Sequence, residues 1–188
     1  GLSTIGLATD AKGWIPVDDR MQTGAPGVYA IGDVLGPERV MLAHVASTES
    51  MVAVENALGA ERRMDYTAVP GAIFTMPEVA CIGLTDAQAK EQGIDARTDS
   101  VLFRTIGKAH VIGEMAGQAT IVSDAGNGRV LGVHIIGPHA TDLLGEGALA
   151  VTNNLTVTDV ANTIHAHPTL PEIMVEAALK AAGKALHG

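Results

Sequence analysis

Cysteine, aromatic residues and positive charge are all scarce in this sequence. It holds one cysteine, Cys81, which excludes an intrachain disulfide and a thiol metal cluster, and the apolar neighbours of Cys81 predict a buried, inert thiol. Twelve basic residues stand against 21 acidic ones, for a net charge of −9, and the longest basic run is the pair Arg62-Arg63. Binding to phosphate backbones requires a basic surface, so the composition argues against nucleic acid as a partner.

Long hydrophobic runs are also absent. No apolar segment approaches the roughly 20 residues that span a bilayer, and the N-terminus lacks a basic-then-apolar signal pattern. We therefore expect a soluble, cytoplasmic protein that does not bind membranes. The 188 residues, 47% of them apolar and 18% charged, are enough for one well-packed domain plus part of another. Because the chain begins with Gly1 and not with methionine, we expect it to come from something longer or to have lost a tag.

The first third of the chain has the pattern of a strand, a loop and a helix. Residues 14–20 (WIPVDDR) are typical of a short edge strand, since Pro16 is excluded from the middle of a sheet. The apolar run 28–31, closed by Gly32-Asp33, predicts a strand buried on both faces of a parallel sheet. Apolar residues at helical spacing then predict a helix over 43–58 that ends at Gly59.

Beyond residue 67 the pattern changes to short strands and interleaved helices, which predicts an α+β fold with an antiparallel sheet flanked by helices. We place a boundary there and expect two domains, 1–66 and 67–188. The expected strands are 71–75, 78–83, 100–104, 118–124 and 129–137, with a hairpin turn at 125–128. The expected helices are about 85–92, begun by Thr85 as N-cap, about 139–153 and about 171–187.

The segment Gly145 to Ala150 (GEGALA) matches the glycine pattern of dinucleotide-binding loops. That pattern has meaning only where a strand turns into a helix, because the glycines then admit a pyrophosphate to the helix N-terminus. Here it follows a helical segment. We reject a dinucleotide site and interpret the glycines as allowing close helix packing.

Gly32 and Asp33 occupy the end of the expected strand 28–31, where ligands bind in open α/β sheets. The Asp33 carboxylate is suited to accept hydrogen bonds from ligand hydroxyls, and the helix N-terminus near Ala43 is suited to stabilise a negatively charged group. The alternative is a simple turn after a strand. The pattern alone leaves both interpretations open.

The stretch HAHPTLPE, His165 to Glu172, also has two interpretations. Residues 169–172 fit a capping box with Thr169 as N-cap and Pro171 in the first helical turn, so that Glu172 serves the helix start. Alternatively, Glu172 orients His167, whose backbone is restricted by Pro168, and the pair acts as a general acid and base.

A metal site is a further possibility for the three histidines His139, His165 and His167. The spacing of two between His165 and His167 does not give the i, i+4 geometry of a zinc helix, and no cysteine is nearby. We therefore expect no metal.

Five motifs together resemble a known family. GVYAIGDV, MLAHVAS, FTMPEVACIGLT, GVHIIGPHATDLL and HAHPTLPE occur in the order and approximate spacing of the C-terminal part of the dihydrolipoamide dehydrogenases, which are flavin-dependent pyridine nucleotide-disulfide oxidoreductases. The resemblance covers essentially all of the chain. It implies that 1–66 is the C-terminal remnant of an FAD-binding domain and that 67–188 is a dimerisation domain.

The resemblance also implies roles for individual residues. Gly32-Asp33 resembles the site of the aspartate that binds the ribitol of FAD. His167 resembles the histidine that exchanges a proton with the dithiol substrate, and Glu172 resembles the glutamate that orients this histidine. In the family this pair acts across a dimer interface, on the flavin and redox disulfide of the other subunit. The residues that face the pyrimidine edge of the flavin are implied to be Met41, Leu42, Ala43 and His44.

The implied cofactors are FAD and NAD, and the implied partners are a second copy of the chain and the lipoyl groups of 2-oxoacid dehydrogenase or glycine cleavage complexes. The family's redox-active cysteine pair, FAD pyrophosphate loop and nicotinamide fingerprint are not among these residues, so we expect the isolated chain to be inactive. Pro171 departs from the small or polar residue of many relatives, although it suits a first helical turn. Two alternatives remain: a sister disulfide reductase acting on glutathione, trypanothione or mercuric ion, and a non-catalytic dimerisation module.

Overall fold

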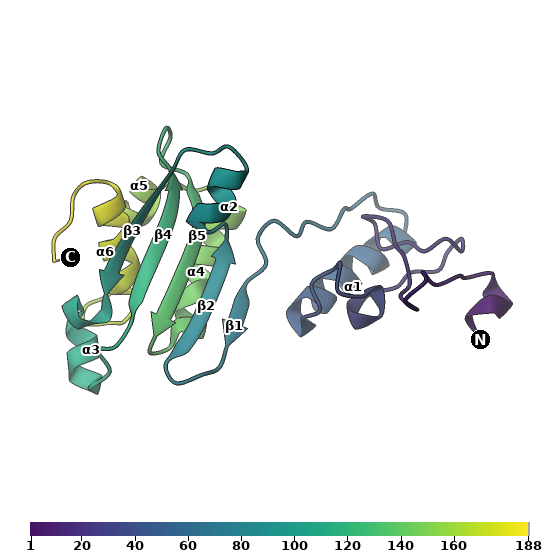
Figure 1. Ribbon diagram of the computed structural model, residues 1–188, viewed down its shortest axis with the longest axis horizontal. Helices are drawn as coiled ribbons and strands as arrows, with labels where there is room; N and C mark the ends of the chain where they lie inside the picture. The colour runs from purple at the N-terminus through teal and green to yellow at the C-terminus, as the bar shows by residue number, and fades with distance from the viewer. Residues whose placement is uncertain (188) are drawn as a thin grey trace. The chain divides into compact units, whose positions relative to one another are not determined.

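The computed structural model describes residues 1–187, and the chain divides into two compact units, Gly1–Tyr66 (unit 1) and Thr67–Gly188 (unit 2) (Figure 1). Each unit has hydrophobic clusters of its own. Within the described part of the chain, no helix has the length and apolar character needed to cross a bilayer.

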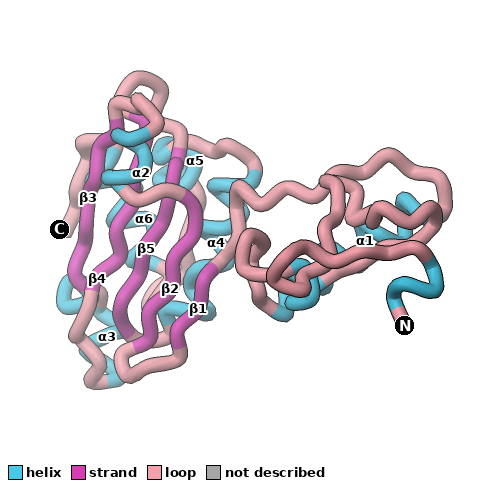
Figure 2. Tube along the Cα trace, turned by 45° about the vertical axis from the view of Figure 1, so that its right-hand side comes forward, coloured by secondary structure: helices cyan, strands magenta, loops and turns pink. Residues whose placement is uncertain are grey.

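Unit 2 is built on a five-stranded sheet in which every neighbouring pair of strands is antiparallel (Figure 2). The strand order is β1-β2-β5-β4-β3. The strands are β1 Gly71–Ile73, β2 Glu78–Gly83, β3 Ala96–Leu102, β4 Gln118–Asp124 and β5 Val130–Gly137. This arrangement confirms the predicted α+β fold, and the predicted ranges of β2 and β4 are confirmed at both ends.

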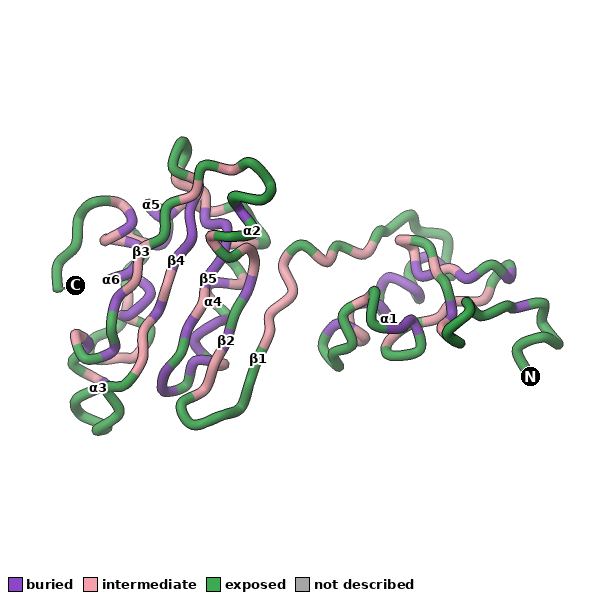
Figure 3. The backbone as a smooth tube through the Cα atoms, in the orientation of Figure 1, coloured by how far each residue is buried: buried purple, intermediate pink, exposed green. Residues whose placement is uncertain are grey.

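Three helices cover one face of this sheet: α4 (Ala140–Thr152), α5 (Val157–Asn162) and α6 (Glu172–Ala181) (Figure 1). The main core lies between this face and the helices, where the tube in Figure 3 is largely buried. Its fully buried side chains include Ile82, Val133, Ile135, Ile173 and Met174. Burying each large apolar side chain contributes roughly 1.5–3 kcal/mol, so this layer holds the unit together.

Gly147 brings α4 close to the sheet. A Cβ at this position would lie 2.9 Å from the Cβ of Val133 on β5, closer than real side chains approach. The prediction that the GEGALA glycines allow close packing is therefore confirmed for Gly147. It is wrong for Gly145, where an added Cβ would meet only open space.

Alternation along β2 decides the environment of Cys81. Ala80 and Ile82 point into the core, and Cys81 between them is exposed on the other face. The prediction of a buried thiol is wrong, because a strand places successive side chains on opposite faces however apolar its sequence is.

Some predicted strand ends are shifted. β1 stops at Ile73, and Phe74 beyond it is 80% exposed. β3 begins at Ala96, four residues before the expected Ser100, and ends at Leu102. It ends there because Phe103, which is fully buried, begins a 3-10 helix, η3 (Phe103–Thr105). Pairing with β4 extends this strand through polar residues that have no strand-like pattern of their own.

Side-chain capping boxes begin two of the helices, α2 (Asp86–Glu91) and α5. Thr85 caps α2 and forms a complete capping box with Gln88, as predicted. Thr156 forms an equivalent box with Asp159 at the start of α5. The sequence interpretation missed α5 and also α3 (Gly107–Ile112), since neither short helix shows a long apolar periodicity.

Unit 1 holds one long helix, α1 (Ala43–Ala57), which confirms the helix predicted over 43–58. The strands predicted at 14–20 and 28–31 are wrong. These segments make only the isolated bridges Val17 to Thr23 and Gln22 to Tyr29. A strand needs a partner that continues for several residues, and the described residues of unit 1 supply none. Instead, the residues after the second segment form a short 3-10 helix, η2 (Gly32–Leu35).

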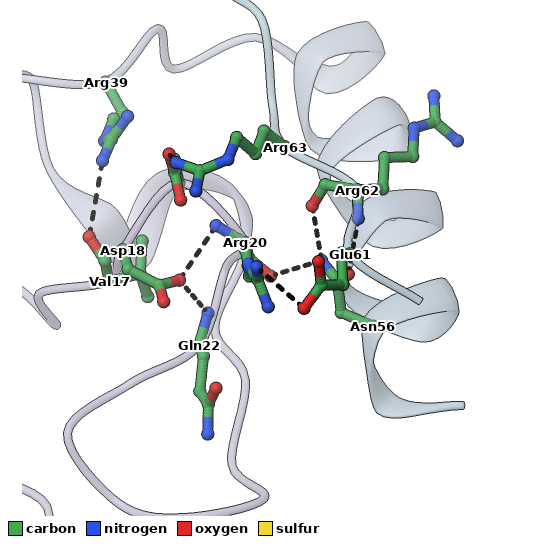
Figure 4. A network of polar contacts seen from close by, with 10 residues as sticks. Val17, Asp18, Arg20, Gln22, Arg39, Asn56, Glu61, Arg62 and Arg63 are labelled. Carbon is green, nitrogen blue, oxygen red and sulfur yellow. Dashed lines mark hydrogen bonds and ion pairs between the residues drawn. The ribbon is translucent and has the colours of Figure 1, made fainter. Parts of the chain in front are cut away.

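Polar contacts hold the irregular part of unit 1 against α1 (Figure 4). The side-chain amide of Asn56 donates to the carbonyl oxygens of Arg20 and Arg62, at 3.1 and 2.7 Å, and its oxygen accepts from the Arg62 N–H. Asp18 closes a tight turn by accepting from the N–H groups of Arg20 and Gln22, both at 2.9 Å. In these loops, side chains therefore bond to backbone N–H and C=O groups that would pair with a neighbouring strand in a sheet.

Candidate functional site

His167 and Glu172 form a hydrogen-bonded pair at the start of α6. Nδ1 of His167 lies 2.7 Å from Oε1 of Glu172. The His167 side chain is 76% exposed, whereas that of Glu172 is 20% exposed. The carboxylate is thus held by the fold, and the imidazole projects from it toward solvent.

The electrostatics of the pair fix which nitrogen of His167 is basic. Desolvation acts to raise the pKa of Glu172, but hydrogen bonds from the Thr169 N–H and from His167 outweigh it, so that the pKa lies below its ordinary value. An ionised Glu172 only accepts hydrogen bonds, so Nδ1 of His167 carries a proton and Nε2 is left as the basic nitrogen. This is the arrangement that a general base requires.

The same carboxylate also serves the helix start. Its second oxygen, Oε2, accepts the Thr169 N–H at 2.8 Å, which is one half of the predicted capping box. The other half is missing: the Thr169 hydroxyl donates to the carbonyl oxygen of Ala166 at 2.6 Å, and Pro171 is the N-cap residue. The prediction of Thr169 as N-cap is therefore wrong, because its hydroxyl closes the preceding loop. The expected helix over 171–187 also ends early, at Ala181, two residues before Gly183 in a left-handed conformation.

His165 has a different environment from His167. Its side chain is 7% exposed, its Nε2 lies 3.0 Å from both carboxylate oxygens of Glu146 on α4, and its Nδ1 lies 2.8 Å from the carbonyl oxygen of Thr163. Both ring nitrogens are occupied by the fold, so His165 fastens the His167 loop to α4. Glu146 lies in the GEGALA segment, and no sequence pattern indicated that it pairs with His165.

A second histidine–glutamate pair adjoins the first. Glu176, one turn after Glu172 on α6, is buried and accepts from Nδ1 of His187 at 2.7 Å. The bond to Glu176 raises the pKa of His187. A cavity of about 270 Å³ is lined by both pairs and by Thr105, Ile106 and Gly107. Sequence reasoning missed this pair, although the i, i+4 spacing of the two glutamates placed them on one helix face.

The residues expected to bind a flavin lie in unit 1. Gly32 begins η2 with a φ of 72°, a left-handed backbone, and the next residue, Asp33, is exposed. The N-cap of α1 is the apolar Leu42, which provides no side-chain hydrogen bond. Met41, Leu42, Ala43 and His44 are all exposed at this end of the helix.

These features fit an anionic or hydroxyl-bearing ligand. A 15-residue helix without a side-chain cap presents a partial positive charge at its N-terminus, and a carboxylate in the adjoining η2 can accept from hydroxyls. His139, His165 and His167 do not meet at one point, and no cluster suited to a metal ion is found within residues 1–187.

Comparison with known families accounts for both units. The profile of the pyridine nucleotide-disulphide oxidoreductase dimerisation domain matches residues 69–178, more than half of the chain. The chain belongs to the pyridine nucleotide-disulphide oxidoreductase family. A second profile of this family, described as pyridine nucleotide-disulphide oxidoreductase, matches residues 1–50.

Individual members of this family are similar over the whole chain. The dihydrolipoyl dehydrogenase of Chlamydia muridarum is 46% identical over 187 residues, and that of Bacillus subtilis is 45% identical over 188. The crystal structure of LpdA from Mycobacterium tuberculosis superposes with a TM-score of 0.88 at 31% identity, covering 96% of this chain and 39% of that one. The chain spans 40% of the length of the Chlamydia relative and 39% of the Bacillus relative.

Proposed function

We propose that this chain is the C-terminal portion of an FAD-dependent dihydrolipoyl dehydrogenase, which reoxidises dihydrolipoamide with NAD. The observation that carries the proposal is the 2.7 Å hydrogen bond from His167 to Glu172, which leaves the second ring nitrogen of His167 free at the start of α6. The names of the relatives, at 42–46% identity, support it.

His167 acts as the general base in this proposal. Its Nε2 takes a proton from a thiol of dihydrolipoamide, and Glu172 stabilises the imidazolium that forms. As the two thiols of the substrate form a disulfide they lose two electrons and two protons: NAD takes up both electrons and one proton as NADH, and the other proton is released to solvent. A positioned acid/base group contributes roughly 10²- to 10⁴-fold to such a step.

Unit 1 supplies part of the flavin site. The Asp33 carboxylate would accept from the ribityl hydroxyls, and the pyrimidine edge would be bordered at the start of α1 by Met41, Leu42, Ala43 and His44. When bound, FAD would supply the two-electron transfer to NAD. The positive end of the α1 dipole favours negative charge at that edge.

The remaining parts of the active site come from outside these residues. Unit 2 is the dimerisation domain of a homodimer, and each His167–Glu172 pair serves the flavin and redox-active cysteines of the other subunit. Unit 1 is the end of the FAD-binding domain. The partners are the lipoyl groups of 2-oxoacid dehydrogenase or glycine cleavage complexes, and the place of action is the cytoplasm.

A substrate assay tests this proposal. The full-length protein that carries this chain is assayed with dihydrolipoamide and NAD, and separately with NADPH and glutathione disulfide, trypanothione disulfide or mercuric ion. We expect turnover with dihydrolipoamide and NAD, and none with the other substrates. Turnover with one of the other substrates would instead assign a sister reductase, and no turnover with any of them would favour a non-catalytic dimerisation module.

A further inference from the structure

Glu49 is a buried carboxylate to which the mechanism above gives no role. It lies on α1, and the whole residue is 1% exposed. Each of its oxygens accepts one short hydrogen bond: Oε2 from the Gly32 N–H at 2.7 Å, and Oε1 from the Tyr66 hydroxyl at 2.6 Å. A carboxylate is costly to bury, and these two donors are what stabilises it there.

The first bond constrains the backbone beside Asp33. Gly32 has a left-handed φ of 72°, and a Cβ on it would lie 3.4 Å from the Cβ of Ala46 on α1. The observed tie between this loop and the helix is the hydrogen bond to Glu49. It acts on the residue directly before Asp33.

The second bond fixes the carboxylate itself. Burial and the hydrogen bond to Glu49 raise the pKa of Tyr66 to about 12, so the phenol stays protonated and remains a donor at neutral pH. The guanidinium of Arg39 lies 5.1 Å from the centre of the Tyr66 ring and restricts its position. Tyr66 thus orients Glu49, and Glu49 orients the Gly32 amide.

We propose that Glu49 is a positioning residue for the flavin-binding loop: by holding the Gly32 N–H, it sets the Asp33 carboxylate against the N-terminus of α1 in the geometry that FAD requires. This rests on the proposed function, since it takes FAD to be the ligand of unit 1. Without Glu49, the part-buried Gly32 N–H loses its acceptor and the loop is released. Glu49 itself does not touch the ligand.

The test uses the full-length protein with its flavin removed. FAD is titrated back into the wild type, Glu49→Ala, Glu49→Gln and Tyr66→Phe, and the dissociation constant is measured from the quenching of flavin fluorescence. Hydrogen exchange at the Gly32 amide is followed by mass spectrometry in the absence of FAD. Glu55→Gln, at an exposed position on the same helix, is the matched control.

We expect Glu49→Ala to weaken FAD binding about 10- to 100-fold and to speed exchange at Gly32. Glu49→Gln keeps an oxygen for the Gly32 N–H and stays within about threefold of wild type. Tyr66→Phe keeps the hydrogen bond between Glu49 and the Gly32 N–H, and its FAD affinity falls between those of Glu49→Gln and Glu49→Ala. Glu55→Gln matches the wild type.

Two results would overturn the proposal: unchanged FAD affinity and exchange in Glu49→Ala, or equal losses in Glu49→Gln and Glu49→Ala. If Glu49→Ala does not fold, the FAD affinities of the other two variants decide. The proposal then requires Glu49→Gln to bind FAD nearly as tightly as the wild type and Tyr66→Phe to bind it more weakly than Glu49→Gln. Failure of the proposed function has a different signature. In that case the wild type itself does not bind FAD, while exchange at Gly32 still reports whether Glu49 holds the loop.

Discussion

At the scale of single residues, two glutamates, Glu172 and Glu49, each accept hydrogen bonds from two separate parts of the fold. Glu172 accepts both from His167 and from the Thr169 N–H, so that it orients an imidazole and completes a helix start with the same side chain. Catalysis and capping, which the sequence posed as alternatives, are compatible. Glu49 joins Gly32 to Tyr66 in the same manner.

His187 gives a pH-dependent prediction at this scale. Glu176 raises the pKa of His187, so the pair stabilises the fold fully below the ordinary histidine pKa of about 6.5 and loses this contribution as the pH rises through the raised value. We expect His187→Gln to lower the thermal midpoint at pH 6, with a difference from wild type that shrinks under alkaline conditions. A difference that is independent of pH would contradict the pairing.

Residue types and local order predicted part of the candidate site. The sequence placed His167 and Glu172 close enough to pair, because both lie within one short loop and helix start. It could not reveal that Glu146 holds His165, because that bond joins residues 19 apart and depends on how α4 packs. Glu49 had a usable signal: its spacing from Val45 and Val52 places it on the buried face of α1.

At the scale of elements, patterns predicted the sheet of unit 2 better than the loops of unit 1. Strands β2, β4 and β5 carry their own alternating or apolar pattern and found antiparallel partners within the chain. The segments 14–20 and 28–31 have strand-like sequences, but among the described residues they have no continuous partner. Strand formation depends on neighbours as much as on propensity.

The packing of α4 on β5 gives a prediction at this scale with a built-in control. Gly147→Ala puts a Cβ 2.9 Å from that of Val133, and we expect it to lower the free energy of unfolding by about 1–3 kcal/mol. Gly145→Ala, on the same helix, meets open space, and we expect it to raise that energy by up to about 1 kcal/mol through helix propensity. Urea unfolding measures both. Equal effects of the two substitutions would refute the close contact.

At the scale of the whole molecule, we propose that the chain carries two parts of a larger active site. Unit 1 presents Asp33 and the start of α1, and unit 2 presents His167 with Glu172. The chain spans 40% of the length of its Chlamydia relative, so the proposed reaction needs residues beyond these. With Cys81 as its single cysteine, this stretch does not hold a redox-active pair of its own.

The most direct test of the account is the turnover of His167→Gln in the full-length protein, assayed with dihydrolipoamide and NAD. His139→Gln, another exposed histidine beside a carboxylate, serves as the control. We predict that His167→Gln lowers kcat by about 10²- to 10⁴-fold while FAD content and oligomeric state match the wild type, and that His139→Gln leaves kcat unchanged. A His167→Gln protein with kcat within a few-fold of the wild type would contradict the assignment of His167 as the base.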